Sequence, residues 1–140
     1  MLLTVEKVLI LSSVEIFSEI PGDVLVEVSA ALREQELSAG ETIIKKGEFG
    51  TSMYIIVSGK VRVHDNGKEL SVLGDHDVFG ELAALDPENR TASVTAVEDT
   101  LLLKMRHEEL MELIPSSVEL ARGIIRFLCR RFRKSISAKN

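Results

Sequence analysis

A glutamate and an arginine nine residues apart are the residues of this sequence best suited to hold a ligand. Glu81 follows a glycine and precedes a short apolar stretch at 82–85, and Arg90 follows an acidic loop. If the apolar stretch forms a helical turn, its first backbone N–H groups lack intrahelical acceptors and can receive an anion. Arg90 can donate two parallel hydrogen bonds to that anion, and the Glu81 carboxylate can accept from sugar hydroxyls. The spacing therefore indicates a site for a sugar phosphate.

No comparable set of residues points to catalysis or to metal binding. The sequence shows no Ser-His-Asp arrangement and no paired acids at a useful spacing, so we expect a protein that is not an enzyme. The sequence has three histidines, His64, His76 and His107, and no two of them have the spacing of metal ligands on a helix or hairpin. No metal or other cofactor is therefore expected. Cys129 lies inside a helical pattern without a base nearby, which predicts a buried, inert thiol.

Length and composition favour an intracellular globular protein. Of the 140 residues, 45% are hydrophobic and 28% are charged, which suits one folded domain rather than a disordered segment. A single cysteine excludes a disulfide-stapled secreted scaffold. The longest aliphatic run, residues 8–11, is too short for a transmembrane segment, and the first four residues lack the basic start of a secretory signal. We therefore expect a cytoplasmic protein, or the cytoplasmic domain of a larger one.

The net charge of −5 is unevenly distributed. Residues 1–115 hold ten basic and 21 acidic side chains, a net of −11, whereas residues 116–140 hold seven basic and one acidic, a net of +6. An anion that enters so acidic a body needs a local positive site, and Arg90 with the neighbouring N–H groups has to provide it.

Between residues 35 and 105 the pattern is that of many short strands. Six glycines between positions 40 and 74 punctuate stretches that are rich in β-branched and apolar residues. Val61 and Val63 alternate with polar residues, as in a half-buried strand, and the dipeptide Asn66-Gly67 is typical of a type I′ hairpin turn. These features predict a mainly β fold with flanking helices, in which the strands form an antiparallel barrel or jelly roll.

A helical pattern precedes the strands. Apolar residues at helical spacing over 24–32 predict a helix that ends near Arg33. Upstream, Ser12 and Glu15 have the spacing of a capping box, which predicts the start of a helix at that point.

A second helical pattern follows the strands. Residues 107–114 predict a short helix closed by Pro115, and Ser116-x-x-Glu119 has capping-box spacing before a long periodic run. In that run, apolar residues at intervals of 3, 4, 3 and 4 form a heptad seam, which consists of Val118, Ala121, Ile125, Leu128 and Phe132. A second apolar stripe consists of Leu120, Ile124 and Phe127, and arginines line another face.

The segment 79–92 resembles the phosphate-binding cassette of the cyclic nucleotide-binding domain family, which includes the catabolite activator protein and protein kinase A regulatory subunits. The motif of that family is Phe-Gly-Glu, small or apolar residues, a variable loop, and an arginine before a small residue and a strand. Here Phe79-Gly80-Glu81 and Arg90-Thr91-Ala92 match it. The resemblance covers nearly the whole chain. It implies a double-stranded β-helix (jelly-roll) barrel within a single domain at 1–140, with an N-terminal helical segment at 1–34, the barrel at 35–105 and C-terminal lid helices at 106–140.

The resemblance also implies a role for each matching residue. Arg90 would pair with the cyclic phosphate, Glu81 would accept the ribose 2′-hydroxyl, and Gly80 would let the backbone approach the sugar. The phosphate cradle would be completed by the backbone N–H groups of Leu82 and Ala83 and by Thr91. An apolar wall beside the purine would be formed by Val63, Leu70 and Leu73.

A regulatory domain that binds cyclic AMP and relays the signal through its C-terminal helices is what the resemblance implies. Cyclic GMP stays open as the ligand, because a threonine after the arginine, as in Thr91, favours guanine in cyclic GMP-dependent kinases. A second copy of the chain or an attached effector domain is the expected partner of the last helix. A base-reading helix-turn-helix would need roughly 50–70 further residues, so no binding of nucleic acid by this chain alone is expected.

The alternative is a barrel without a ligand that serves as an interaction or dimerisation module. The arginine-rich tail suits a solvated helix face, a dimer or neighbouring-domain contact, or a contact with anionic lipid or nucleic acid. Intact Glu81 and Arg90 argue for ligand binding. His76 stands where the family often has glycine, and we expect it to strain or reshape that turn.

Overall fold

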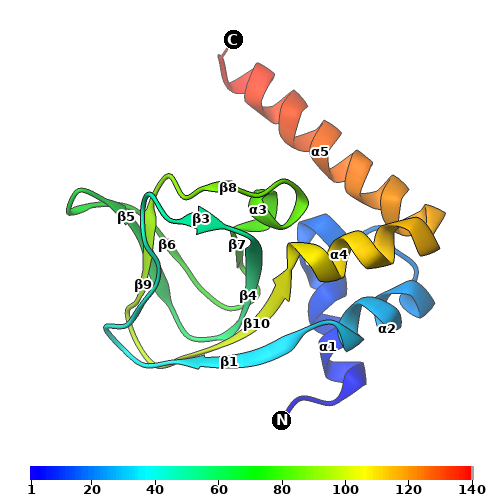
Figure 1. Ribbon diagram of the computed structural model, residues 1–140, viewed down its shortest axis with the longest axis horizontal. Helices are drawn as coiled ribbons and strands as arrows, with labels where there is room; N and C mark the ends of the chain where they lie inside the picture. Colours follow the sequence, from blue (N-terminus) through cyan, green and yellow to red (C-terminus); the bar gives the residue numbers. More distant parts are fainter. Residues whose placement is uncertain (140) are drawn as a thin grey trace. The chain divides into compact units, whose positions relative to one another are not determined.

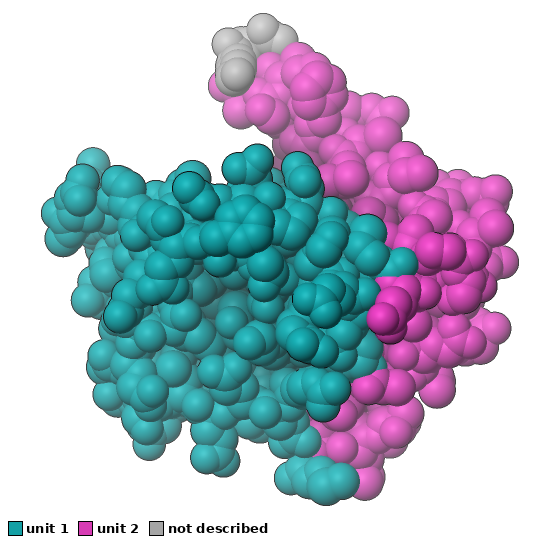
Figure 2. All heavy atoms as spheres, viewed as in Figure 1, with its two compact units in different colours: residues 1, 31–111 teal, residues 2–30, 112–140 magenta. Residues whose placement is uncertain are grey.

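The structure, a computed structural model, describes residues 1–139, so the last residue of the predicted 1–140 domain lies outside the described residues. The chain divides into two compact units, coloured separately in Figure 2. The first consists of Met1 and Ala31–Met111, and the second of Leu2–Ala30 and Glu112–Asn140. That residues 1–140 form a single domain stays a prediction.

The first unit is a barrel of two facing antiparallel sheets (Figure 1). One sheet has the strand order β1-β10-β4-β7 and the other β2-β9-β5-β6, and β3 pairs with β8. The strands are β1 (Arg33–Leu37), β2 (Thr42–Ile44), β3 (Phe49–Gly50), β4 (Ser52–Ser58), β5 (Val61–Asp65), β6 (Lys68–Leu73), β7 (Val78–Phe79), β8 (Glu88–Asn89), β9 (Ser93–Ala96) and β10 (Thr100–Arg106). The predicted mainly β fold with flanking helices is confirmed, and Arg33 begins a strand rather than ending a helix.

The predicted hairpin joins β5 to β6. Asp65 pairs with Lys68, and the two residues between them have positive φ angles, 52° at Asn66 and 80° at Gly67. A type I′ turn requires this backbone, because its twist matches that of the two strands it connects. The Asn-Gly dipeptide thus sets the register of the hairpin.

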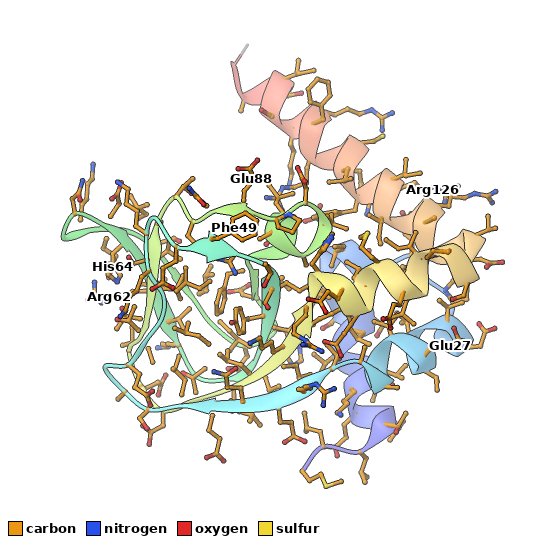
Figure 3. The ribbon with its side chains drawn as sticks, viewed as in Figure 1. Glu27, Phe49, Arg62, His64, Glu88 and Arg126 are labelled. Atoms are coloured by element: carbon orange, nitrogen blue, oxygen red, sulfur yellow. The ribbon has the colours of Figure 1, made fainter. Side chains whose placement is uncertain are left out.

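Alternation along β5 separates the core from the surface. Val61 is buried and Val63 packs against the core, whereas Arg62 and His64 project from the outer side of the barrel (Figure 3). The Nε2 atom of His64 lies 2.8 Å from the hydroxyl of Thr95 on the outer face. The buried barrel core consists of Leu37, Ile44, Tyr54, Ile56, Val61, Phe79, Val94, Ala96 and Leu102. Within the part of the chain that the structure describes, no group of three or more His, Cys, Asp or Glu side chains is placed to hold a metal.

The second unit is helical. Its elements are α1 (Thr4–Ser13), the 3₁₀ turn η1 (Glu15–Phe17), α2 (Gly22–Ala30), the end of α4 (His107–Leu113), the 3₁₀ turn η2 (Ile114–Ser116) and α5 (Val118–Lys139). The interpretation of Ser12 as a helix cap is wrong, because Ser12 lies inside α1 and its hydroxyl donates to the Leu9 carbonyl. The helix instead begins near Leu3, whose N–H donates to the Glu6 carboxylate over 2.9 Å.

The start of α5 is also displaced by one residue from its predicted position. Ser117, rather than Ser116, accepts a hydrogen bond from the N–H of Leu120. The hydroxyl of Ser116 donates to the Leu113 carbonyl, because Ser116 still belongs to η2, which includes Pro115. Capping-box spacing therefore located the helix correctly and the capping residue incorrectly.

Along α5, the two predicted apolar stripes differ in burial. Leu120, Ile124 and Phe127 are buried, while Ile125 is 59% and Phe132 67% exposed. The prediction that Cys129 is buried is wrong. Its place four residues after Ile125 and three before Phe132 puts it on the same exposed helix face. No described helix combines the length and apolar character needed to cross a membrane.

Candidate functional site

A glycine in a left-handed conformation starts the cassette. Gly80 has a φ of 77° and joins β7 to the short helix α3 (Glu81–Leu85). A Cβ atom at this position would lie 2.7 Å from the Ser52 carbonyl oxygen and 2.9 Å from the Nη1 atom of Arg90. Both the backbone angle and the close approach therefore require glycine here. The Gly80 carbonyl accepts hydrogen bonds from the N–H groups of Ala83 and Ala84, over 3.1 and 3.3 Å.

The backbone of Arg90 is held by the turn around Gly47. The Arg90 N–H donates to the Glu48 carbonyl over 2.7 Å, and the Gly47 N–H donates to the Arg90 carbonyl over 2.9 Å. Just before Arg90, β8 pairs with β3, so that Asn89 lies opposite Phe49. The turn around Gly47, about 40 residues earlier in the sequence, thus fixes the position of the Arg90 backbone.

The Arg90 side chain packs between two glycines. Its Nη2 atom donates to the Ser52 carbonyl over 2.7 Å. A Cβ atom on Gly50 would lie 2.5 Å from Cζ and 2.7 Å from Cδ of Arg90, and a Cβ on Gly80 would meet Nη1. The guanidinium can occupy this place only because neither Gly50 nor Gly80 carries a side chain.

This guanidinium is half-buried and lacks a counter-ion within the described part of the chain. Desolvation lowers the pKa of Arg90, and the neighbouring Tyr54 opposes that shift. Even so, an arginine in a protein remains charged. Among the described residues, no ion pair joins Arg90 to a carboxylate. A partly desolvated charge without a partner is costly, so the site is suited to receive an anion.

A cavity of about 150 Å³ adjoins Arg90 on the barrel side. Tyr54 stacks on Phe79 with ring centres 5.1 Å apart, and the Lys104 Nζ atom lies 5.8 Å from the centre of the Tyr54 ring. Burial raises the pKa of the Tyr54 hydroxyl, and the charge of Arg90 partly offsets this shift. The cavity is lined by Ile43, Ile44, Glu48, Phe49, Gly50, Thr51, Ser52, Tyr54, Arg90 and Lys104.

The other predicted cassette residues surround the α3 end of the site. Glu81 is partly exposed in the first turn of α3, and Leu82 is exposed beside it. Ala83 is buried, and its N–H already donates to Gly80. Thr91 directly follows Arg90 and has an exposed side chain. The structure thus brings Gly80 and Arg90 into close contact and leaves Thr91 at the surface.

The three residues predicted to flank a purine differ in placement. Val63 and Leu73 pack against the barrel core. Leu70 is 53% exposed, and it lies on the edge strand β6, whose residues from Lys68 to Val72 are all exposed. Val63 pairs with Ser71 and His64 with Glu69, so Leu70 faces no residue of β5. The role of all three beside a base stays a prediction.

Comparison with known proteins shows the family. The family model of the cyclic nucleotide-binding domain matches residues 34–117. The chain belongs to the cyclic nucleotide-binding domain family. It is 31% identical over 131 residues, 90% of its length, to the CRP-like cAMP-activated global transcriptional regulator of Mycobacterium tuberculosis. It is 39% identical over 101 residues, 69% of its length, to the cyclic AMP receptor protein of Thermus thermophilus.

The chain spans 58% and 47% of the lengths of these two relatives. Among solved structures, the N-terminal domain of a transcriptional regulator from Streptomyces coelicolor superposes with a TM-score of 0.88 at 29% identity. That match covers 94% of this chain and 95% of the other. The jelly-roll barrel predicted from the cassette is thereby confirmed.

Sequence reasoning missed several residues of this cyclic nucleotide-binding domain. Ser52 takes part through its backbone carbonyl and Gly50 through its missing side chain, so neither has a chemical signature in the sequence. Lys104 had a detectable signal, since it follows Leu102 by two residues on the same face of a strand. That signal was obscured by the run of three leucines at 101–103.

Proposed function

We propose that this cyclic nucleotide-binding domain is a non-catalytic sensor whose ligand is cyclic AMP. The observation that carries the proposal is the Arg90 guanidinium, which is half-buried, unpaired with any described carboxylate and fixed by the Ser52 carbonyl. The name of the Mycobacterium tuberculosis relative, a cAMP-activated regulator, supports cyclic AMP as the ligand.

In the proposed complex, Arg90 pairs with the cyclic phosphate and Glu81 accepts the ribose 2′-hydroxyl. Gly80 allows the sugar to approach, while the N–H groups of Leu82 and Ala83, together with Thr91, complete the phosphate cradle. The Ala83 N–H has to exchange its present acceptor, the Gly80 carbonyl, for a phosphate oxygen. Because that carbonyl also accepts from the Ala84 N–H, it remains hydrogen-bonded after the exchange.

The purine occupies the apolar part of the barrel in this proposal, beside Val63, Leu73 and Leu70. Val63 and Leu73 already offer core surface. Leu70, now half-exposed, reaches a base only if the end of the β5–β6 hairpin moves toward it.

Signalling further requires that the ligand prefer one arrangement of the C-terminal helices, because equal affinity for two arrangements shifts neither population. We assign this relay to α4 and α5. The exposed seam of α5 supplies a surface for a second copy of the chain or for an attached effector.

Calorimetry with cyclic AMP and cyclic GMP tests the ligand assignment. We expect tighter binding of cyclic AMP, and a loss of about 1–3 kcal/mol in Glu81→Ala, typical of a hydrogen bond to a charged group. Tighter binding of cyclic GMP would identify cyclic GMP as the ligand and Thr91 as the residue that favours guanine. Absence of binding by either nucleotide would overturn the proposal.

A dimerisation module is the second candidate, and the exposed apolar seam of α5 is the observation that favours it. Light scattering separates the two candidates. A stable dimer that binds no cyclic nucleotide would identify a dimerisation module, whereas nucleotide binding in any oligomeric state would identify a sensor.

A further inference from the structure

Lys104 faces the interior of the barrel. In the ladder between β10 and β4, Leu102 pairs with Ile56 and Lys104 pairs with Tyr54. Leu102, Ile56 and Tyr54 belong to the buried core. Residues two apart on a strand share a face, so Lys104 continues the inward row that begins with Leu102.

Lys104 and Arg90 line one cavity. The ammonium of Lys104 lies 5.8 Å from the centre of the Tyr54 ring, and the charge of Arg90 acts on the hydroxyl of that same tyrosine. Both cations are among the residues that line the 150 Å³ cavity. Within the described part of the chain, neither forms an ion pair with a carboxylate.

Such a pair of cations is unfavourable in the empty domain. Like charges repel one another, and partial burial disfavours the charged form of Arg90. The carboxylate of Glu48 also lines the cavity, but its side chain is exposed to water, which weakens its attraction for either cation. An anion held at Arg90 would reverse the sign of the interaction with Lys104.

We propose that Lys104 is a second cationic group of the ligand site, which attracts the phosphate bound at Arg90 and strengthens nucleotide binding. This inference rests on the proposed cyclic nucleotide binding. Arg90 supplies the directional hydrogen bonds, and Lys104 supplies charge across the cavity. Because the barrel interior screens charge less than water does, the attraction extends beyond direct contact.

Lys104→Gln tests this role in the full chain, with Lys68→Gln as a matched control. Lys68 is exposed in the β5–β6 hairpin and loses the same charge. Calorimetry with cyclic AMP at low and high salt should show Lys104→Gln weakened by about 5- to 30-fold at low salt, as expected for a partly desolvated charge pair. The difference from the control should shrink at high salt.

Lys104→Arg separates charge from packing. It should bind cyclic AMP within about threefold of wild type, because it keeps the charge.

The outcomes distinguish this inference from the proposed function. The wild type could bind cyclic AMP while Lys104→Gln and Lys68→Gln show equal affinities and an equal dependence of affinity on salt. That result would overturn the role of Lys104 and leave the sensor function intact. Weak binding of cyclic AMP by both Lys104→Gln and Lys104→Arg at all salt concentrations would show that Lys104 acts through packing. That result would also overturn the proposed role of its charge. Failure of the wild type to bind any cyclic nucleotide would overturn the proposed function first, and this inference with it.

Discussion

The guanidinium of Arg90 donates a 2.7 Å hydrogen bond to the backbone carbonyl of Ser52, 38 residues earlier in the chain. This bond connects the end of the cassette to the first residue of β4. It fixes the arginine without neutralising it, because a carbonyl is a dipole and not an anion. The positive charge therefore remains available to a ligand.

Gly50→Ala should displace Arg90. The new Cβ would overlap the guanidinium, so we expect about 1–3 kcal/mol of lost stability, as for overpacking elsewhere, together with weaker binding of cyclic AMP. Gly40→Ala is the control, since Gly40 has a φ of 88° but a Cβ added there would meet no heavy atom within 4 Å. It should lose about 1 kcal/mol from backbone strain alone and bind normally. Thermal melts and calorimetry measure both effects, and equal binding by the two variants would contradict the packing account.

Tyr54 should make the stability of the domain fall at alkaline pH. Burial raises the pKa of Tyr54 in the folded state. Its contribution to stability is therefore complete below the unfolded pKa of about 10 and is lost as the pH rises through the higher folded-state pKa. Tyr54→Phe should flatten this decline. A decline of the same steepness in both proteins would show that other groups cause it.

The same tyrosine should report ligand binding, because it is the sole tyrosine of the sequence. The charge of Arg90 lowers the pKa of Tyr54. A phosphate that neutralises this charge should raise the pKa further, and absorbance titration of the tyrosinate can follow it. Arg90→Ala should raise the pKa of Tyr54 in the absence of ligand. A lower pKa of Tyr54, either on ligand binding or in Arg90→Ala, would contradict the placement of Arg90 beside Tyr54.

His76→Gly should stabilise the domain. His76 has a φ of 67°, an angle that L residues adopt at a cost of about 1–2 kcal/mol, although its N–H donates to the Ile56 carbonyl. Glycine removes the steric cost and adds conformational entropy to the unfolded chain, so the net gain should be about 0.5–1 kcal/mol. Ser71→Gly, in the middle of β6, should destabilise instead. Denaturant melts decide this, and a loss of stability in His76→Gly would mean that the imidazole contributes more than its backbone angle costs.

Ile125→Glu should disrupt a dimer formed through α5. The side chain is 59% exposed in the single chain and would be buried in a paired seam. A buried, unpaired carboxylate should weaken association at least about tenfold. Ser137→Glu, on the polar side of the same helix, adds the same charge and should leave association unchanged. Light scattering over a dilution series tests this, and equal dissociation of the two variants would place the contact elsewhere.

Two local signals in the sequence predicted structure well, whereas the capping boxes at Ser12 and Ser116 did not identify the capping residue. The Asn66-Gly67 turn depends on two residues alone, and the cassette is one continuous segment, so both could be predicted without knowledge of the tertiary fold. The partners of Arg90 could not. Ser52 acts through its backbone carbonyl, which any residue type can supply. Gly50 acts through the absence of a side chain, which any glycine can supply. The pairing of β3 with β8, together with the backbone hydrogen bonds of Arg90 to Gly47 and Glu48, brings them to the arginine.

Exposure on α5 was unpredictable for a similar reason. Two apolar stripes are visible in the sequence, and either could face the protein. The structure buries Phe127 and leaves Phe132 in solvent. The absence of a side chain at Gly123, where a Cβ would lie 2.8 Å from Ile20, allows the Phe127 side of the helix to approach its neighbour closely. Cys129 is exposed as a consequence.

The most direct test of the sensor function is the affinity of Arg90→Ala for cyclic AMP, measured by calorimetry beside Arg62→Ala. Arg62 lies on the outer side of β5 (Figure 3), so its substitution removes the same charge from the domain without touching the site. We predict that Arg62→Ala binds like wild type and that Arg90→Ala loses about 2–5 kcal/mol, as expected when one partner of a desolvated charge pair is removed. Equal affinities of wild type and Arg90→Ala would contradict the assignment of the site.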